Sequence, residues 1–130
     1  MKKLVICALP LVLTCVTQVS FAGSHLPQQL HDLSRTLTSI SNEKPGDLCS
    51  GDLVVAGAYL DAGAFKLERN KMNEALVSLK YGQNELKDIS TKRAYCTYFA
   101  PKVKPLLAQL IRLSGEIEAN QLALSESFIG

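Results

Sequence analysis

The chain has no tryptophan, only two histidines and few aromatic residues, which occupy 6% of its 130 positions. His25 and His31 are six residues apart, so on a helix they point about 240° apart and cannot form the i, i+4 pair of a metal site. We expect both to face solvent, where histidine can still respond to pH. HExxH, GxSxG, phosphate-loop and CxxC motifs are also missing. These absences predict a protein that is not an enzyme and has no cofactor or metal.

The chain also lacks a strong excess of positive or negative charge. The chain has 14 basic and 12 acidic residues, and the basic excess is accounted for by Lys2 and Lys3. Without the first 22 residues the chain is formally neutral. Nucleic-acid binding needs a net basic face whose counterion release supplies affinity, so we expect no nucleic-acid partner.

The N-terminus has the three-part pattern of a secretory signal peptide. Two lysines precede the apolar run 4–16, and the small-residue site SFA follows at 20–22. We expect residues 1–22 to be removed after Ala22, leaving one domain over 23–130 in the periplasm or outside the cell.

Two kinds of membrane anchor are disfavoured. The apolar run is about 13 residues long, which is short for a bilayer span, so we expect no integral membrane segment in the mature protein. A lipoprotein attached through Cys15 would need a small residue just before it, and Thr14 is unsuited.

Removal of the signal peptide also removes Cys7 and Cys15, which leaves Cys49 and Cys96. An even pair in an oxidising compartment predicts a disulfide bond. Closing a loop of that length stabilises the fold by about 4 kcal/mol in the chain-entropy model. A redox pair or a thiolate metal site is disfavoured, because neither cysteine lies in a CxxC motif or near a histidine.

Apolar spacing predicts an all-α fold, a small four-helix bundle or an array of helical hairpins, with no period-two segment that would indicate a strand. The cleanest stripe has steps of four, three, four and three residues. It consists of Leu26, Leu30, Leu33, Leu37 and Ile40. The predicted helices are 26–41, from Ser50 or Asp52 to 68, 72–89, and 102–119 with a tail that frays through 124.

The second and third predicted helices form a hairpin with many small residues. Asn70 suits the left-handed conformation that ends a helix, so the break falls at 69–71. Glycine inside a helix costs up to about 1 kcal/mol relative to alanine, which indicates a packing role. Close approach of the two helix axes is expected at Gly57, Gly63, Ala75 and Gly82.

Residues 57–90 resemble a single tetratricopeptide repeat (TPR). The matching packing positions are Tyr59, Gly63, Met72, Ala75, Leu79 and Gly82. The sequence departs from the family pattern at Lys66, where an aromatic is usual, and at Lys87, where proline is usual. No second copy is present, although stacked arrays normally need about three units.

The resemblance implies a scaffold for protein contacts, with the outer helices capping one repeat. The alternative is a plain four-helix domain whose hairpin packs tightly. Two looser likenesses rest on size, helicity and one disulfide: acid-activated periplasmic chaperones, and the pilotins that escort secretin subunits.

A basic segment rich in aromatics surrounds the second cysteine of the pair. Its candidate partner-binding residues are Lys92, Arg93, Tyr95, Tyr98, Phe99, Lys102 and Lys104. A basic rim around aromatics suits an acidic peptide or an anionic envelope polymer. The alternative is that the aromatics cover the disulfide while the lysines keep the segment soluble. We therefore expect an exported module that binds a protein of the cell envelope, or else a chaperone that responds to acid or stress, or a pilotin-like escort.

Overall fold

The computed structural model describes residues 25–129, and side chains as far as residue 126. The predicted signal peptide, with Cys15, lies outside the described residues. Within the described part the chain is all-helical and has no strand, as predicted. Its elements are a first helix over 25–41, α2 (Leu48–Glu68), α3 (Met72–Thr91), the short 3-10 turn η1 (Ala94–Cys96) and α4 (Ala100–Ile129).

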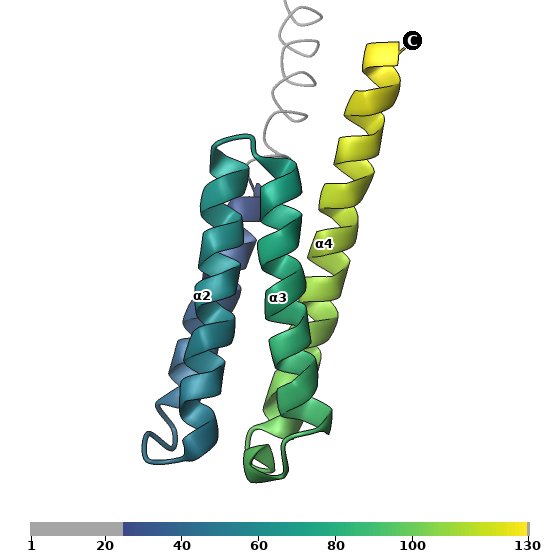
Figure 1. The fold of residues 1–130 in the computed structure, drawn as a ribbon. Coiled ribbons are helices and arrows are strands. Elements are labelled where there is room, and N and C mark those ends of the chain that lie inside the picture. The colour runs from purple at the N-terminus through teal and green to yellow at the C-terminus, as the bar shows by residue number, and fades with distance from the viewer. Residues whose placement is uncertain (1–24, 130) are drawn as a thin grey trace, which may run out of the picture.

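The hairpin of α2 and α3 organises the fold (Figure 1). The first helix lies behind α2, and α4 runs along α3 on the side away from α2. The far end of α4 extends past the turn that joins α2 to α3. This turn lies at the predicted position, and Asn70 has the left-handed conformation expected there, with a φ of 61°.

The largest differences from the predicted helix boundaries are in α2 and α4. α2 begins earlier because Asp47, and not Ser50 or Asp52, caps it: Asp47 Oδ1 accepts a hydrogen bond of 2.8 Å from the Cys49 amide. α4 is longer at both ends than predicted. It tolerates Pro105 in its second turn, at the cost of one backbone hydrogen bond.

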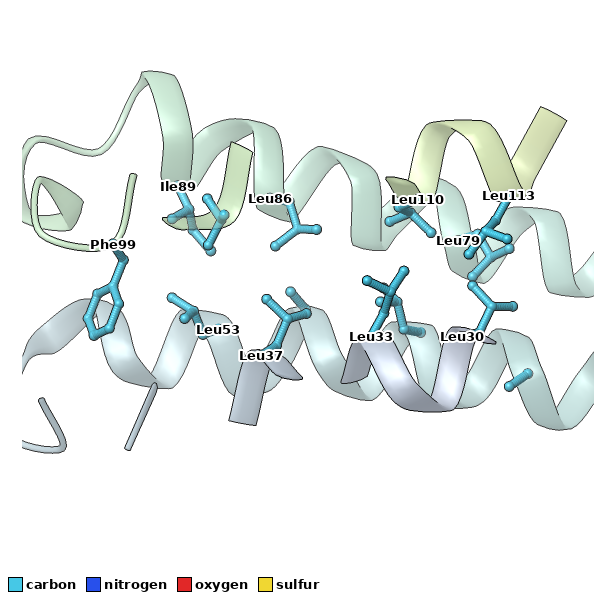
Figure 2. Close-up of a cluster of buried hydrophobic side chains, with 14 of the residues drawn as sticks. Leu30, Leu33, Leu37, Leu53, Leu79, Leu86, Ile89, Phe99, Leu110 and Leu113 are labelled. Carbon is cyan, nitrogen blue, oxygen red and sulfur yellow. The ribbon is translucent and has the colours of Figure 1, made fainter. Parts of the chain in front are cut away.

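One apolar core joins all four α-helices of the described region. Figure 2 shows leucines of the first helix and α2 pointing toward those of α3 and α4. The predicted stripe of the first helix is buried except for Ile40, which is half-buried. Ile111 on α4 lies outside this core and is more than half exposed. The fully buried large side chains are Leu30, Leu37, Leu53, Leu60, Leu79, Leu86, Ile89, Phe99, Val103, Leu110, Leu113 and Ile117.

Two glycines bring α2 and α3 together as predicted. A Cβ added at Gly63 would lie 2.5 Å from Leu79 Cδ2, and one at Gly82 would lie 2.6 Å from Leu60 Cδ1. Gly57 serves a different contact: an added Cβ would lie 3.1 Å from Ser34 Oγ, on the first helix. The small residues of α2 therefore allow close packing against two neighbours.

The disulfide joins Cys49 in the first turn of α2 to Cys96 in η1, with a Cα–Cα distance of 5.2 Å. Both cysteines are fully buried. The bond pins the start of α2 to the segment that leads into α4, and the α2–α3 hairpin returns the chain to that point. This arrangement is the predicted one.

Of the described helices, only α2 is long and apolar enough to cross a membrane on those two criteria alone. Its inner side is part of the core described above. Helices at the centre of soluble folds meet the same criteria, so this observation does not identify a membrane protein.

Candidate functional site

The disulfide end of the bundle is organised by Arg93. Its guanidinium contacts Glu85 at short range and lies 3.1 Å from Asp52 Oδ2 and 3.8 Å from Asp88 Oδ2. Glu85 and Asp52 raise the pKa of Arg93, with the hydrogen bond to Glu85 as the largest cause. Arg93 thus joins α2, α3 and the approach to η1, and it is not a free cation offered to a partner.

Tyr95 extends this cluster to the surface. Its hydroxyl donates a 2.9 Å hydrogen bond to Asp52 Oδ2, and this bond raises the pKa of the phenol. The side chain is nevertheless 49% exposed. About half of this residue is therefore accessible while its hydroxyl is fixed.

A second cluster forms where Tyr98 and Lys102 contact Glu43 and Lys44, on the linker between the first helix and α2. Both donate hydrogen bonds of 2.9 Å to Glu43 Oε1. These two bonds lower the pKa of Glu43, with the Lys102 bond as the larger cause. The ammonium groups of Lys44 and Lys102 also lie 4.3 and 5.0 Å from the centre of the Tyr98 ring.

The structure therefore divides the predicted basic aromatic segment. Phe99 is fully buried, so placing it on a binding surface was wrong: its ring fills the core beside Tyr98, at a centroid distance of 5.0 Å. Lys104 is exposed on α4, and helical geometry turns it away from Lys102 by about 200°. Lys92 is exposed and lies 3.5 Å from Asp88.

An unpredicted apolar residue completes this end. Leu48, the first residue of α2, is 80% exposed, and it lies one turn before Asp52, the acceptor of the Tyr95 hydroxyl. We call Leu48, Lys92 and Tyr95 the disulfide-end surface. Tyr95 and Lys92 contact two carboxylates of the cluster around Arg93, Asp52 and Asp88, and Leu48 precedes Asp52 on the same helix.

The TPR-like positions fall on the hairpin contact. Ala75, Leu79 and Gly82 are buried, Gly63 packs on Leu79, and Met72 is half-buried at the start of α3. The Tyr59 ring stacks on Tyr81 at a centroid distance of 5.5 Å. The Lys66 ammonium donates to Ser78 Oγ at 2.9 Å.

His31 differs from the prediction that both histidines face solvent. Its Nδ1 lies 2.9 Å from Asp61 Oδ1 and its Nε2 lies 3.6 Å from Glu68 Oε1, and the side chain is mostly covered. The ring also meets Phe65 edge-on, at a centroid distance of 4.9 Å. His25 is exposed, as predicted.

Ser34 joins the same cluster, with its hydroxyl 2.9 Å from both Asp61 Oδ2 and the Gly57 carbonyl oxygen. In a nucleophilic triad the histidine lies between serine and carboxylate, whereas here Asp61 lies between Ser34 and His31. The arrangement ties the first helix to α2. A lone aspartate in the middle of an apolar helix was the sequence signal for it.

Three side chains that could ligate a metal, Cys49, Asp52 and Cys96, have their ligand atoms within 4.8 Å of one another. The disulfide uses both sulfurs, so neither is a thiolate ligand in this state. Arg93 also places a positive charge beside Asp52. The residues present therefore do not fit a cation.

Two shallow grooves border α4. One, of about 560 Å³, lies between the α2–α3 turn and the α4 extension, and is lined by Lys71, Met72, Glu74, Gln121 and Leu124 among others. The other, of about 400 Å³, lies between α3 and α4 and includes Lys80 and Glu118. Gln83 donates to Ser114 Oγ at its wall. Neither groove gathers the positioned polar groups typical of a small-molecule site.

Comparison of the chain with protein-family models, with curated proteins and with solved structures yields no match.

Proposed function

We propose that the protein is an exported, non-catalytic module that binds another protein of the cell envelope through the disulfide-end surface. The observation that carries this proposal is a large exposed leucine, Leu48, one helical turn before the aspartate that fixes the hydroxyl of the half-exposed Tyr95. Solvent-exposed apolar and aromatic side chains on a rigid support are typical of binding surfaces.

Rigidity strengthens the proposal. Association costs free energy for every side chain and loop that it orders, so a surface fixed beforehand binds more tightly for the same contacts. Here the disulfide and the Arg93 cluster fix the backbone, and the bond to Asp52 fixes Tyr95. The exposed ammonium of Lys92 favours an acidic group at the edge of the partner's surface.

Export rests on the signal-peptide pattern and on the disulfide. Disulfides persist in the periplasm and outside the cell, and are rare in a reducing cytosol.

The proposal is tested by photo-crosslinking in cells that produce the whole chain. A photoreactive amino acid replaces Tyr95, and the matched control carries it at Ala108, an exposed position on α4. We expect a discrete adduct from position 95 that Leu48→Glu abolishes, and none from position 108. Equal labelling at both positions, or no adduct at position 95, contradicts the proposal.

A specific observation also favours an acid-responsive chaperone. The contacts at the disulfide end are ion pairs that use the carboxylates of Glu43, Asp52, Glu85 and Asp88, and the pKa of Glu43 is lowered by its bonds to Lys102 and Tyr98, so its stabilising contribution is lost in strong acid. Such a chaperone would expose apolar core surface and bind unfolded proteins while the disulfide holds the chain together. Binding of a dye for apolar surface at pH 2 to 3 and at pH 7 distinguishes the two functions: a reversible rise in acid supports the chaperone, and none supports the constitutive module.

A further inference from the structure

The outer side of α2 is as apolar as its inner side. Helices at the surface of a soluble fold usually have one apolar stripe and one polar face, as α3 does. α2 has a second stripe, formed by Gly51, Val55, Ala58, Ala62 and Phe65, at steps of four, three, four and three residues. We call these five residues the outer seam.

The outer seam faces away from the core. Val55 and Phe65 are each about half exposed, as is Val54 beside it. No charged residue belongs to the seam, and its members other than Ala62 are exposed. An added Cβ at Gly51 would meet nothing within 4 Å, so glycine is not required there by packing within this chain. Exposed apolar surface of this extent on one helix indicates that another surface covers it.

We propose that the outer seam is the interface of a homodimer in which α2 packs antiparallel against α2 of a second copy, with Ala58 near the two-fold axis. The order of residue sizes along the seam favours this occupant. Antiparallel pairing about Ala58 places the smallest residue, Gly51, opposite the largest, Phe65. Val55 then lies opposite Ala62, and Ala58 lies opposite Ala58 of the second copy. Each pair of facing residues along the seam can therefore pack closely.

Parallel pairing gives a poorer fit. It places Gly51 opposite Gly51 and Phe65 opposite Phe65, which leaves a gap at one end and crowds the other.

Charge along the edge of the seam agrees with the antiparallel arrangement. Asp52, Tyr59 and Lys66 are spaced seven residues apart on the side of α2 that faces α3. In an antiparallel pair, the edge of α2 that faces α3 lies beside the same edge of the second copy. Asp52 therefore lies nearest to Lys66 of the second copy, and Tyr59 lies nearest to its own equivalent. Asp52 and Lys66 also contact Arg93 and Ser78 within the chain, so the edge places opposite charges near one another at both ends and avoids repulsion between like charges.

The outer seam adjoins the disulfide-end surface, because Leu48 lies three residues before Gly51 on the same side of α2. The dimer needs no partner other than a second copy, so this proposal does not depend on the proposed function and is tested at Ala58, away from Leu48. A single helix pair buries less area than a standard stable interface, and we therefore expect a weak dimer that forms at micromolar or higher concentration.

Two measurements test the dimer. Sedimentation equilibrium of the oxidised, exported protein, from micromolar to near-millimolar concentration, should show a reversible dimer. Ala58→Glu should weaken it at least about tenfold, because a carboxylate at the axis meets its own equivalent in an apolar interface. The matched control Ala108→Glu, on exposed α4, should not change it. A monomer at every concentration, or a dimer unaffected by Ala58→Glu, overturns the proposal.

Cysteine cross-linking tests the orientation, with the Cys49–Cys96 bond first verified by peptide mapping. Ala58→Cys should cross-link to itself, whereas Gly51→Cys and Phe65→Cys should cross-link only when mixed with each other. Self-cross-linking at positions 51 and 65 indicates parallel helices and overturns the proposal. A monomer that instead floats with neutral phospholipid vesicles identifies a lipid surface as the occupant and also overturns it.

Discussion

Replacing Gly63 with alanine tests the close approach of α2 and α3. The new Cβ would lie 2.5 Å from Leu79 Cδ2 and 2.9 Å from Leu79 Cγ, and Leu79 is fully buried and cannot swing into solvent. Alanine gains about 1 kcal/mol over glycine in a helix interior, and forcing a methyl group into a packed core costs about 1–3 kcal/mol. Because this site has no free space, we expect the upper end of that cost and a net destabilisation of about 1–2 kcal/mol.

The matched control is Gly115→Ala on α4, where an added Cβ meets nothing within 4 Å. This control should gain the helical contribution alone, about 0.5–1 kcal/mol. Urea unfolding of the oxidised proteins, followed by circular dichroism at one low concentration, measures both changes. If Gly63→Ala stabilises the protein as much as Gly115→Ala does, the helix axes are further apart than the structure shows and the packing argument is wrong.

Three further predictions concern the disulfide end. Replacing Cys49 and Cys96 together with alanine should lower the free energy of unfolding by about 4 kcal/mol in the chain-entropy model. If the variant and the reduced wild type unfold at the same urea concentration as the oxidised wild type, this prediction is refuted. Arg93→Met should cost about 1–3 kcal/mol, since it leaves Asp52 and Glu85 without their cation, and an unchanged midpoint would show that the cluster contributes nothing. The pKa of Glu43 is lowered in the folded protein, so its contribution is complete above the ordinary value of 4.5 and is lost as the pH falls through the folded pKa. Glu43→Gln should therefore be less stable than the wild type at pH 7 and should lose less stability on acidification, and parallel pH profiles for the two proteins would contradict this assignment.

The sequence predicted the helices because their inner faces repeat with helical period. The stripe from Leu26 to Leu37 is buried along its length, and the break at Asn70 and the pairing of Cys49 with Cys96 also follow from local chemistry. Helix ends were predicted less well. The start of α2 was predicted at Ser50 or Asp52, whereas Asp47 caps the helix, and nothing in the pattern distinguishes one capping side chain from another a few residues away.

The candidate site was harder to predict because it depends on contacts between distant segments. Spacing alone could not show that Arg93 meets Asp52 and Glu85, or that Phe99 points into the core while Tyr98 lies near the surface. A charged residue in a basic run looks the same in sequence whether it is solvated or held by acidic groups from another helix.

The partial burial of His31 was missed for the same reason. Its partners Asp61 and Glu68 lie on a different helix, about thirty or more residues away along the chain. The outer seam, in contrast, is visible in the sequence as a second apolar periodicity in α2. Only the placement of the other helices shows which of the two stripes faces the core.

Both proposals require a helical bundle that is pinned by the Cys49–Cys96 disulfide and acts outside the cytoplasm. Mass spectrometry of the protein isolated from the producing cell's envelope or medium tests this directly. We predict a chain that begins at Gly23, in which the peptides containing Cys49 and Cys96 are joined through their sulfurs. A chain that keeps residues 1–22, or that has free thiols at both cysteines, would contradict it.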